Sequence, residues 1–167
     1  MAVLAVYTSV VSHAAPESGE FELGTDGPSA ILVGVDDSVT AARAAWYAAG
    51  MARRQRARLI VVYVLPIAGT GAAAPAGASV IVAEAAAHDE IAESLRARAG
   101  QVWQELGLSG TFIKAYGDPY SEICRVADET RADAIVVGAS TKAGHRFVGS
   151  LAVRLVRAGK WPVTVVP

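Results

Sequence analysis

The fold of this 167-residue chain is decided by one stretch, which reads Ala132-Asp-Ala-Ile-Val-Val-Gly138, continues through a loop to Gly149, and ends with Ser150-Leu-Ala-Val-Arg-Leu-Val-Arg-Ala-Gly159 and Lys160-Trp-Pro-Val-Thr-Val-Val-Pro167. Residues 134–137 are apolar without a break, which is typical of a strand covered on both faces of a parallel sheet. Apolar residues then recur at helical spacing, and Gly159 and Pro162 predict the end of that helix before a short β-branched strand. The stretch predicts strand, loop, helix and strand.

The loop and the helix start in this stretch have the composition of an anion site. Glycines let backbone amides approach a ligand, and a hydroxyl stands at the start of the helix: Gly138, Gly144, Gly149 and Ser150. From Gly138 to Lys160 there are also Lys142, His145, Arg146, Arg154, Arg157 and Lys160, without any Asp or Glu, although the net charge of the chain is -1. Charge and spacing make Lys142, Arg146 and Arg154 candidates for contact with an anion. The alternative is that the glycines close a loop and the arginines are the solvated face of a helix.

Composition limits the function classes. A 167-residue chain that is 53% hydrophobic is long enough for one well-buried domain. With 15 basic and 16 acidic residues it has no global field that favours nucleic acid or a membrane surface, so neither is expected as a partner. The single cysteine, Cys124, excludes a disulfide framework and a cysteine-rich metal site, and we expect it to be a packed hydrophobe on a helix.

The N-terminal region is predicted to be an extension of the domain. Residues 1–28 should be partly disordered, although Met1 to Val11 could form an extra strand, and residues 29–167 should form the domain. The first fifteen residues are apolar, but no Lys or Arg precedes Arg43, which argues against a signal peptide. No apolar run approaches the length of a membrane span. We therefore expect a cytoplasmic protein.

The domain begins with an apolar strand, Ala30 to Asp36, and Ser38 is predicted to cap a helix that reaches about Arg54. The helical spacing places Val39, Ala42, Trp46 and Ala49 on one face, and the many alanines permit close approach to a sheet. Asp36 and Asp37 then stand at the carboxyl end of the first strand, which is the ligand-binding edge of open α/β sheets. The alternative, favoured for Asp37, is that they only complement the helix dipole.

The middle of the chain continues the alternation of strands and helices. We expect a strand from Arg58 to Leu65, a loop over 66–79 that is a lid or disordered, and a helix over 81–106 with His88 near its polar side. A strand over 111–116 precedes a helix that Asp118 caps, with Pro119 in its first turn and Tyr120, Ile123 and Ala127 inward. This order predicts a parallel sheet with helices on both faces.

Four matches in order make the chain similar to the universal stress protein family. They are Ile31-Leu-Val-Gly-Val-Asp-Asp-Ser38, Val61-Val-Tyr-Val64, Gly117-Asp-Pro119 and the stretch from Ala132 to Pro167. The chain resembles a single-domain, actinobacterial-like variant with a shortened glycine motif. The resemblance implies a Rossmann-like fold related to the adenine nucleotide alpha hydrolases, with five parallel strands in the order 3-2-1-4-5. It also implies a homodimer in which Val163–Val166 of two subunits pair.

The resemblance also implies a binding site for an adenine nucleotide, ATP, with which Mg²⁺ would bind. Asp36 would contact the ribose or adenine side, the backbone of Val64 would contact the adenine, and Gly138, Gly149 and Ser150 would hold phosphates. Ser140, Thr141 and Leu151 complete the implied site. ATP-binding members have a second glycine where this chain has Thr141, and the interval to Gly149 is two residues shorter here. Gly144 is a candidate to compensate for both departures.

Three functions follow. The first is a dimeric ATP-binding stress-response protein that is not an enzyme, although slow ATP hydrolysis is conceivable. The second is a family member that has lost ATP binding and acts as a dimeric protein-interaction adaptor, which the shortened loop favours. The third, a phosphorylated receiver domain, is disfavoured because the chain ends at Pro167 without the lysine that such domains need after their last strand. No nucleophile with a His base partner and no metal-ligand cluster is recognisable in the sequence.

Overall fold

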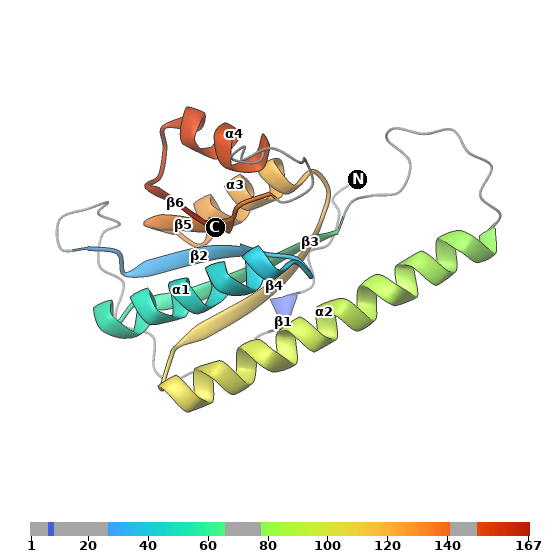
Figure 1. The fold of residues 1–167 in the computed structure, drawn as a ribbon, viewed down its shortest axis with the longest axis horizontal. Coiled ribbons are helices and arrows are strands. Elements are labelled where there is room, and N and C mark those ends of the chain that lie inside the picture. Colours follow the sequence, from blue (N-terminus) through green and yellow to red (C-terminus); the bar gives the residue numbers. More distant parts are fainter. Residues whose placement is uncertain (1–6, 9–26, 66–77, 141–149) are drawn as a thin grey trace.

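The computed structural model describes residues 7–8, 27–65, 78–140 and 150–167, which form one sheet with helices on both faces (Figure 1). The strands are β1 (Tyr7–Thr8), β2 (Ala30–Val35), β3 (Arg58–Leu65), β4 (Gly110–Tyr116), β5 (Ala134–Gly138) and β6 (Val163–Val166). The helices are α1 (Val39–Gln55), α2 (Ala78–Leu106), α3 (Pro119–Glu129) and α4 (Ser150–Ala158). Most of the expected loop over 66–79 lies outside the described residues, and its last two residues belong to α2.

The sheet has the order β1-β4-β3-β2-β5-β6. Its last five strands are parallel, which confirms the expected 3-2-1-4-5 order. β1 adds an antiparallel strand at one edge, where Tyr7 lies opposite Ile113. An extra strand within the first eleven residues was one expectation for the N-terminal region, and two of those residues form it.

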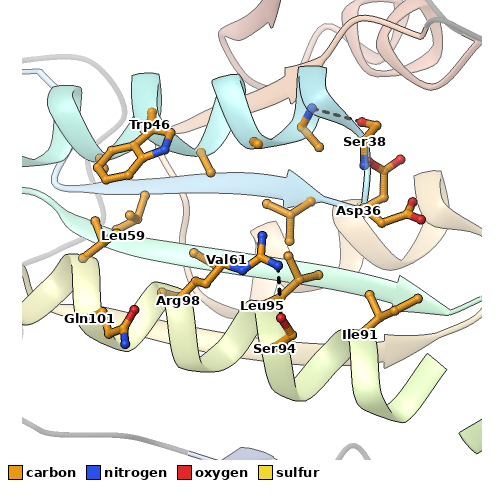
Figure 2. Close-up of a pocket in the computed structure, with 18 of the residues that line it drawn as sticks. Asp36, Ser38, Trp46, Leu59, Val61, Ile91, Ser94, Leu95, Arg98 and Gln101 are labelled. Atoms are coloured by element: carbon orange, nitrogen blue, oxygen red, sulfur yellow. Dashed lines mark hydrogen bonds between the residues drawn. The ribbon is translucent and has the colours of Figure 1, made fainter. Parts of the chain in front are cut away.

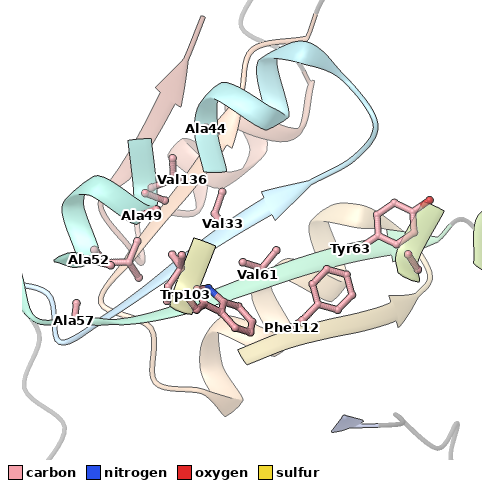
Figure 3. Close-up of a cluster of buried hydrophobic side chains, with 14 of the residues drawn as sticks. Val33, Ala44, Ala49, Ala52, Ala57, Val61, Tyr63, Trp103, Phe112 and Val136 are labelled. Atoms are coloured by element: carbon pink, nitrogen blue, oxygen red, sulfur yellow. The ribbon is translucent and has the colours of Figure 1, made fainter. Parts of the chain in front are cut away.

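Two apolar layers separate the helices from the sheet. One lies under α1 and α2 and contains Val33, Val61, Phe112 and Trp103 (Figure 3). The other lies under α3 and α4 and contains Leu32, Ile123 and Leu155. Both layers exist because β2, β3 and β5 are apolar at successive positions, so that both faces of each strand are buried.

The buried face of α1 differs from the expected one. Val39 is 68% exposed and Trp46 is 59% exposed, whereas the buried residues of the helix are Thr40, Ala41, Ala44, Ala48, Ala49 and Ala52. The interpretation that put Val39, Ala42 and Trp46 on the packed face is therefore wrong, and Ala49 is the member of that set that is buried. Small side chains occupy the buried face because they let the helix backbone lie close to the sheet.

The helix starts agree with the sequence. The Ser38 hydroxyl accepts a hydrogen bond from the Ala41 N–H at 3.1 Å, and Asp118 Oδ2 accepts one from the Ser121 N–H at 3.0 Å. Pro119 occupies the first turn of α3, where its missing N–H is not needed. Ile123 and Ala127 are buried and Cys124 is half-buried beside the same apolar layer, so the cysteine packs as expected.

Candidate functional site

The parallel register brings three residues that are far apart in sequence to the same edge of the sheet. Val35 pairs with Tyr63, so Asp36, directly after β2, lies level with Val64 near the end of β3. Val33 pairs with Val136, which puts Gly138 level with the end of β2 on its other side. Asp36, Val64 and Gly138 therefore meet at the carboxyl edge of the sheet, where open α/β folds bind ligands.

Gly138 also has a packing role at this edge. A Cβ atom on Gly138 would lie 2.6 Å from the Thr40 carbonyl carbon and 2.7 Å from the Ala41 nitrogen, in the first turn of α1. The glycine is needed because β5 passes so close to the start of that helix. This contact brings the end of β5 against Thr40 at the start of α1, four residues after Asp36.

Asp36 is oriented by that turn. Its Oδ1 accepts a hydrogen bond from the Ser38 N–H at 2.9 Å, and the Ser38 hydroxyl in turn caps α1. Among the residues that the structure describes, no group donates a hydrogen bond to Asp36 Oδ2. One carboxylate oxygen of Asp36 thus positions the turn, and the other is available to a ligand hydroxyl.

The remaining expected site residues are placed unevenly. Val64 is half-buried on the α3/α4 side of the sheet, and Ser140 is exposed just after β5. Ser150 is the first residue of α4, and Leu151 packs against the apolar layer under that helix. Thr141 and Gly149 lie outside the described residues, as do Lys142, Gly144 and Arg146 of the anion hypothesis.

Arg154, a candidate for contact with an anion, forms an ion pair with Asp118 in the structure. Its guanidinium donates to both carboxylate oxygens of Asp118, at 3.1 and 3.2 Å, and lies 4.1 Å from the centre of the Tyr120 ring. This pairing with Arg154, followed by the hydrogen bond from the Ser121 N–H, lowers the pKa of Asp118 from its ordinary value. Arg154 therefore ties α4 to the start of α3, and the sequence could not show this because Asp118 lies 36 residues away.

A cluster of polar side chains near the same edge was not expected from the sequence. The hydroxyl of Tyr63 and Nδ1 of His88 are 3.3 Å apart, and Lys114 pairs with Asp89, the next residue of α2. Burial, and then the negative charges of Asp37 and Asp36, raise the pKa of Tyr63. At neutral pH the Tyr63 hydroxyl is therefore protonated and can donate or accept a hydrogen bond. The period of α2 placed His88 near the polar side of the helix, but nothing in the sequence paired it with Tyr63.

Asp36 also lines a cavity. We call it the α1–α2 groove, a space of about 790 Å³ between α1 and α2 above β2 and β3 (Figure 2). Asp36, Asp37 and Ser38 line one part of it, but Val64, Gly138 and Leu151 do not. The groove is on the α1/α2 face of the sheet, whereas Val64 and Leu151 pack against the apolar layer on the α3/α4 face.

Within the described part of the chain, no three His, Cys, Asp or Glu side chains are grouped so that they could hold a metal ion. No helix of the described residues is both long enough and apolar enough to cross a bilayer.

A family model and solved structures both relate the chain to one family. A family model described as the universal stress protein family matches residues 29–167. Among solved structures, a universal stress protein family member from Burkholderia pseudomallei is 30% identical with a TM-score of 0.65, the match covering 83% of this chain and 96% of that one. UspA from Lactobacillus plantarum is 27% identical with a TM-score of 0.68, covering 84% and 99%. A universal stress protein from Archaeoglobus fulgidus, solved in complex with dAMP, is 27% identical with a TM-score of 0.58, covering 83% and 97%. No match was found among curated proteins.

Proposed function

Because the chain belongs to the universal stress protein family, we propose that it binds an adenine nucleotide, ATP, at the carboxyl edge of its sheet and acts in the stress response without catalysing a reaction. The observation that carries this proposal is the meeting of Asp36, Val64 and Gly138 at one level of that edge. The similar protein from Archaeoglobus fulgidus was solved with dAMP, and this supports an adenine nucleotide as the class of ligand.

The residues of the edge have distinct tasks in this proposal. Asp36 offers Oδ2 to a ribose hydroxyl while Oδ1 holds its own turn in place. The Val64 backbone faces the adenine, and the start of α4 at Ser150 supplies N–H groups to phosphate, helped by the helix dipole. Ser140, Thr141, Gly149 and Leu151 complete the site as the family motif implies. A bound Mg²⁺ would offset phosphate charge, and its ligands would come mainly from the phosphates and water.

The proposal includes a cytoplasmic homodimer formed through β6. One side of this strand pairs with β5, where the Ile135 N–H donates to Pro162 O and the Ala139 N–H donates to Val166 O. Residues alternate along a strand, so the backbone groups of Val163 and Val165 point to the opposite side. Within the described residues, no strand pairs with that side, and an unpaired edge is a template for a second copy.

The adaptor alternative is favoured by the two-residue shortening of the loop before Gly149. In that alternative the fold and the dimer remain, but the edge binds no nucleotide. The two functions therefore differ in nucleotide binding alone, and a binding measurement separates them.

The test is calorimetry of the full chain with ATP, ADP, AMP and cyclic AMP. We expect micromolar binding, and we expect Asp36→Asn to weaken it roughly tenfold, because a hydrogen bond from a ligand hydroxyl to a carboxylate contributes about 1.5 to 3 kcal/mol. Asp37→Asn is the matched control, since it removes the same charge one residue away and should change affinity by less than about twofold. Absence of heat with all four nucleotides would overturn the proposal in favour of the adaptor.

A further inference from the structure

The α1–α2 groove has the size and lining of a small-molecule site. Its volume of about 790 Å³ is within the usual range for ligand pockets. Leu59 and Val61 of β3 form its floor, and Leu95 belongs to its α2 wall (Figure 2). The α1 wall is mostly alanine, and these small side chains leave the space open.

Trp46 marks the groove as a binding surface. It is a groove-lining residue and is 59% exposed, because the buried face of α1 is occupied by alanines. Large aromatic side chains that remain exposed beside an apolar hollow are typical of binding sites, since their burial by a ligand is favourable. A ligand with an apolar body would cover the Trp46 ring.

The guanidinium of Arg98 favours a ligand with a negative charge. Its side chain rises from α2 toward the space between the two helices, where its described contact is a 3.2 Å hydrogen bond to the Ser94 hydroxyl (Figure 2). Within the described residues, Arg98 forms no ion pair, whereas Arg96 on the same helix is paired with Glu93. A guanidinium beside an apolar wall, with donors to spare, is a partner for a carboxylate.

The carboxylates that line the groove limit the ligand to one negative charge. On α2, Glu90 is eight residues before Arg98 and Glu105 is seven residues after it, or about 12 Å and 10 Å along the helix. Such distances reach the Debye length at physiological salt, so neither residue strongly opposes an anion at Arg98. A second anionic group farther along the groove would lie closer to Glu90, Asp36 and Asp37, or to Glu105, and would be repelled.

We propose that the α1–α2 groove binds an apolar monocarboxylate of the fatty-acid class, with the carboxylate on the Arg98 guanidinium and the hydrocarbon chain along the apolar walls. The residues that carry this site, Trp46, Leu95 and Arg98, differ from those proposed to hold the nucleotide, although Asp36 lines the groove as well.

Calorimetry of the full chain with decanoate, in the absence of nucleotide, tests the charge of the ligand. We expect decanoate to bind, and decanedioate and decyltrimethylammonium to bind roughly tenfold more weakly or not at all. Arg98→Gln should weaken decanoate binding roughly tenfold, whereas Arg96→Gln, which removes the same charge outside the groove, should change it by less than about twofold. No binding of decanoate, equal affinity for the cationic amphiphile, or an unchanged affinity of Arg98→Gln would each overturn the proposal.

A second pair of variants tests the location. Ala45 is half-buried and lines the groove, and Ala97 is exposed on α2 outside it. Ala45→Phe should fill the groove and abolish decanoate binding, while Ala97→Phe adds the same bulk to solvent and should leave binding unchanged. Far-UV circular dichroism of each variant establishes that the fold is retained, and decanoate binding by a folded Ala45→Phe variant would overturn the location. Because nucleotide is absent throughout, either failure leaves the nucleotide proposal standing.

Discussion

At the scale of single residues, Asp118 shows how one side chain can serve two elements. It caps α3 and pairs with Arg154 of α4, and this pairing lowers its pKa. Protons therefore bind the unfolded chain more readily than the folded one, so the pair stabilises the fold above the unfolded pKa of about 4 and stops doing so as the pH falls through the lower folded pKa. Both side chains are about half exposed, so we expect Asp118→Asn, which keeps the cap, to cost only about 0.5 kcal/mol at pH 7. Chemical unfolding at several pH values should show this difference shrink as the pH falls below about 4, and a difference that stays constant down to the acid limit of folding would contradict it.

At the scale of elements, the residues that adopt the left-handed conformation after the helices are glycines at two helices and arginines at the other two. Gly107 and Gly159 adopt it after α2 and α4 at φ 62°, whereas Arg56 ends α1 at φ 55° and Arg131 follows α3 at φ 52°. An arginine pays a steric cost there that glycine does not. We expect Arg56→Gly to raise the free energy of unfolding by about 0.5 kcal/mol, a net of relieved strain and the greater freedom of glycine when unfolded. Arg53→Gly, inside the last turn of α1, is the control and should lower it by about 1 kcal/mol. Denaturant unfolding measures both, and a loss of stability in Arg56→Gly would show that its left-handed backbone is not strained.

At the scale of the whole molecule, the edge at β6 decides whether two copies pair. Val165 directs its N–H away from β5, so Val165→Pro removes a donor from the free edge and leaves the β5 pairing intact. We expect the wild-type chain to sediment as a dimer at micromolar concentration and Val165→Pro to sediment as a monomer. Val153→Pro would break α4 instead and serves only to show what general unfolding looks like by circular dichroism. A monomeric wild-type chain would contradict the dimer.

Much of the fold could be predicted from the sequence because it depends on local patterns. Uninterrupted apolar strands, the caps Ser38 and Asp118, and helix stops such as Gly107 are read from a few neighbouring residues each. The face of α1 was predicted wrongly because the spacing of Trp46 and Val39 fits a packed helix, whereas the sheet lies too close for any residue larger than alanine or threonine on most of that face. The distance between α1 and the sheet cannot be inferred from the pattern of apolar and polar residues.

The candidate site divides in the same way. Local patterns pointed to Asp36, Gly138 and Ser150, whereas Val64 and the strand order were implied by the family resemblance. The sequence by itself determined the alternation of strands and helices and the positions of the helix caps, because each depends on residues within one or two turns. Only the tertiary structure decided that Arg154 binds Asp118, that Tyr63 meets His88, and that Trp46 and Arg98 line one groove, because each of these depends on how separate elements pack against a common sheet.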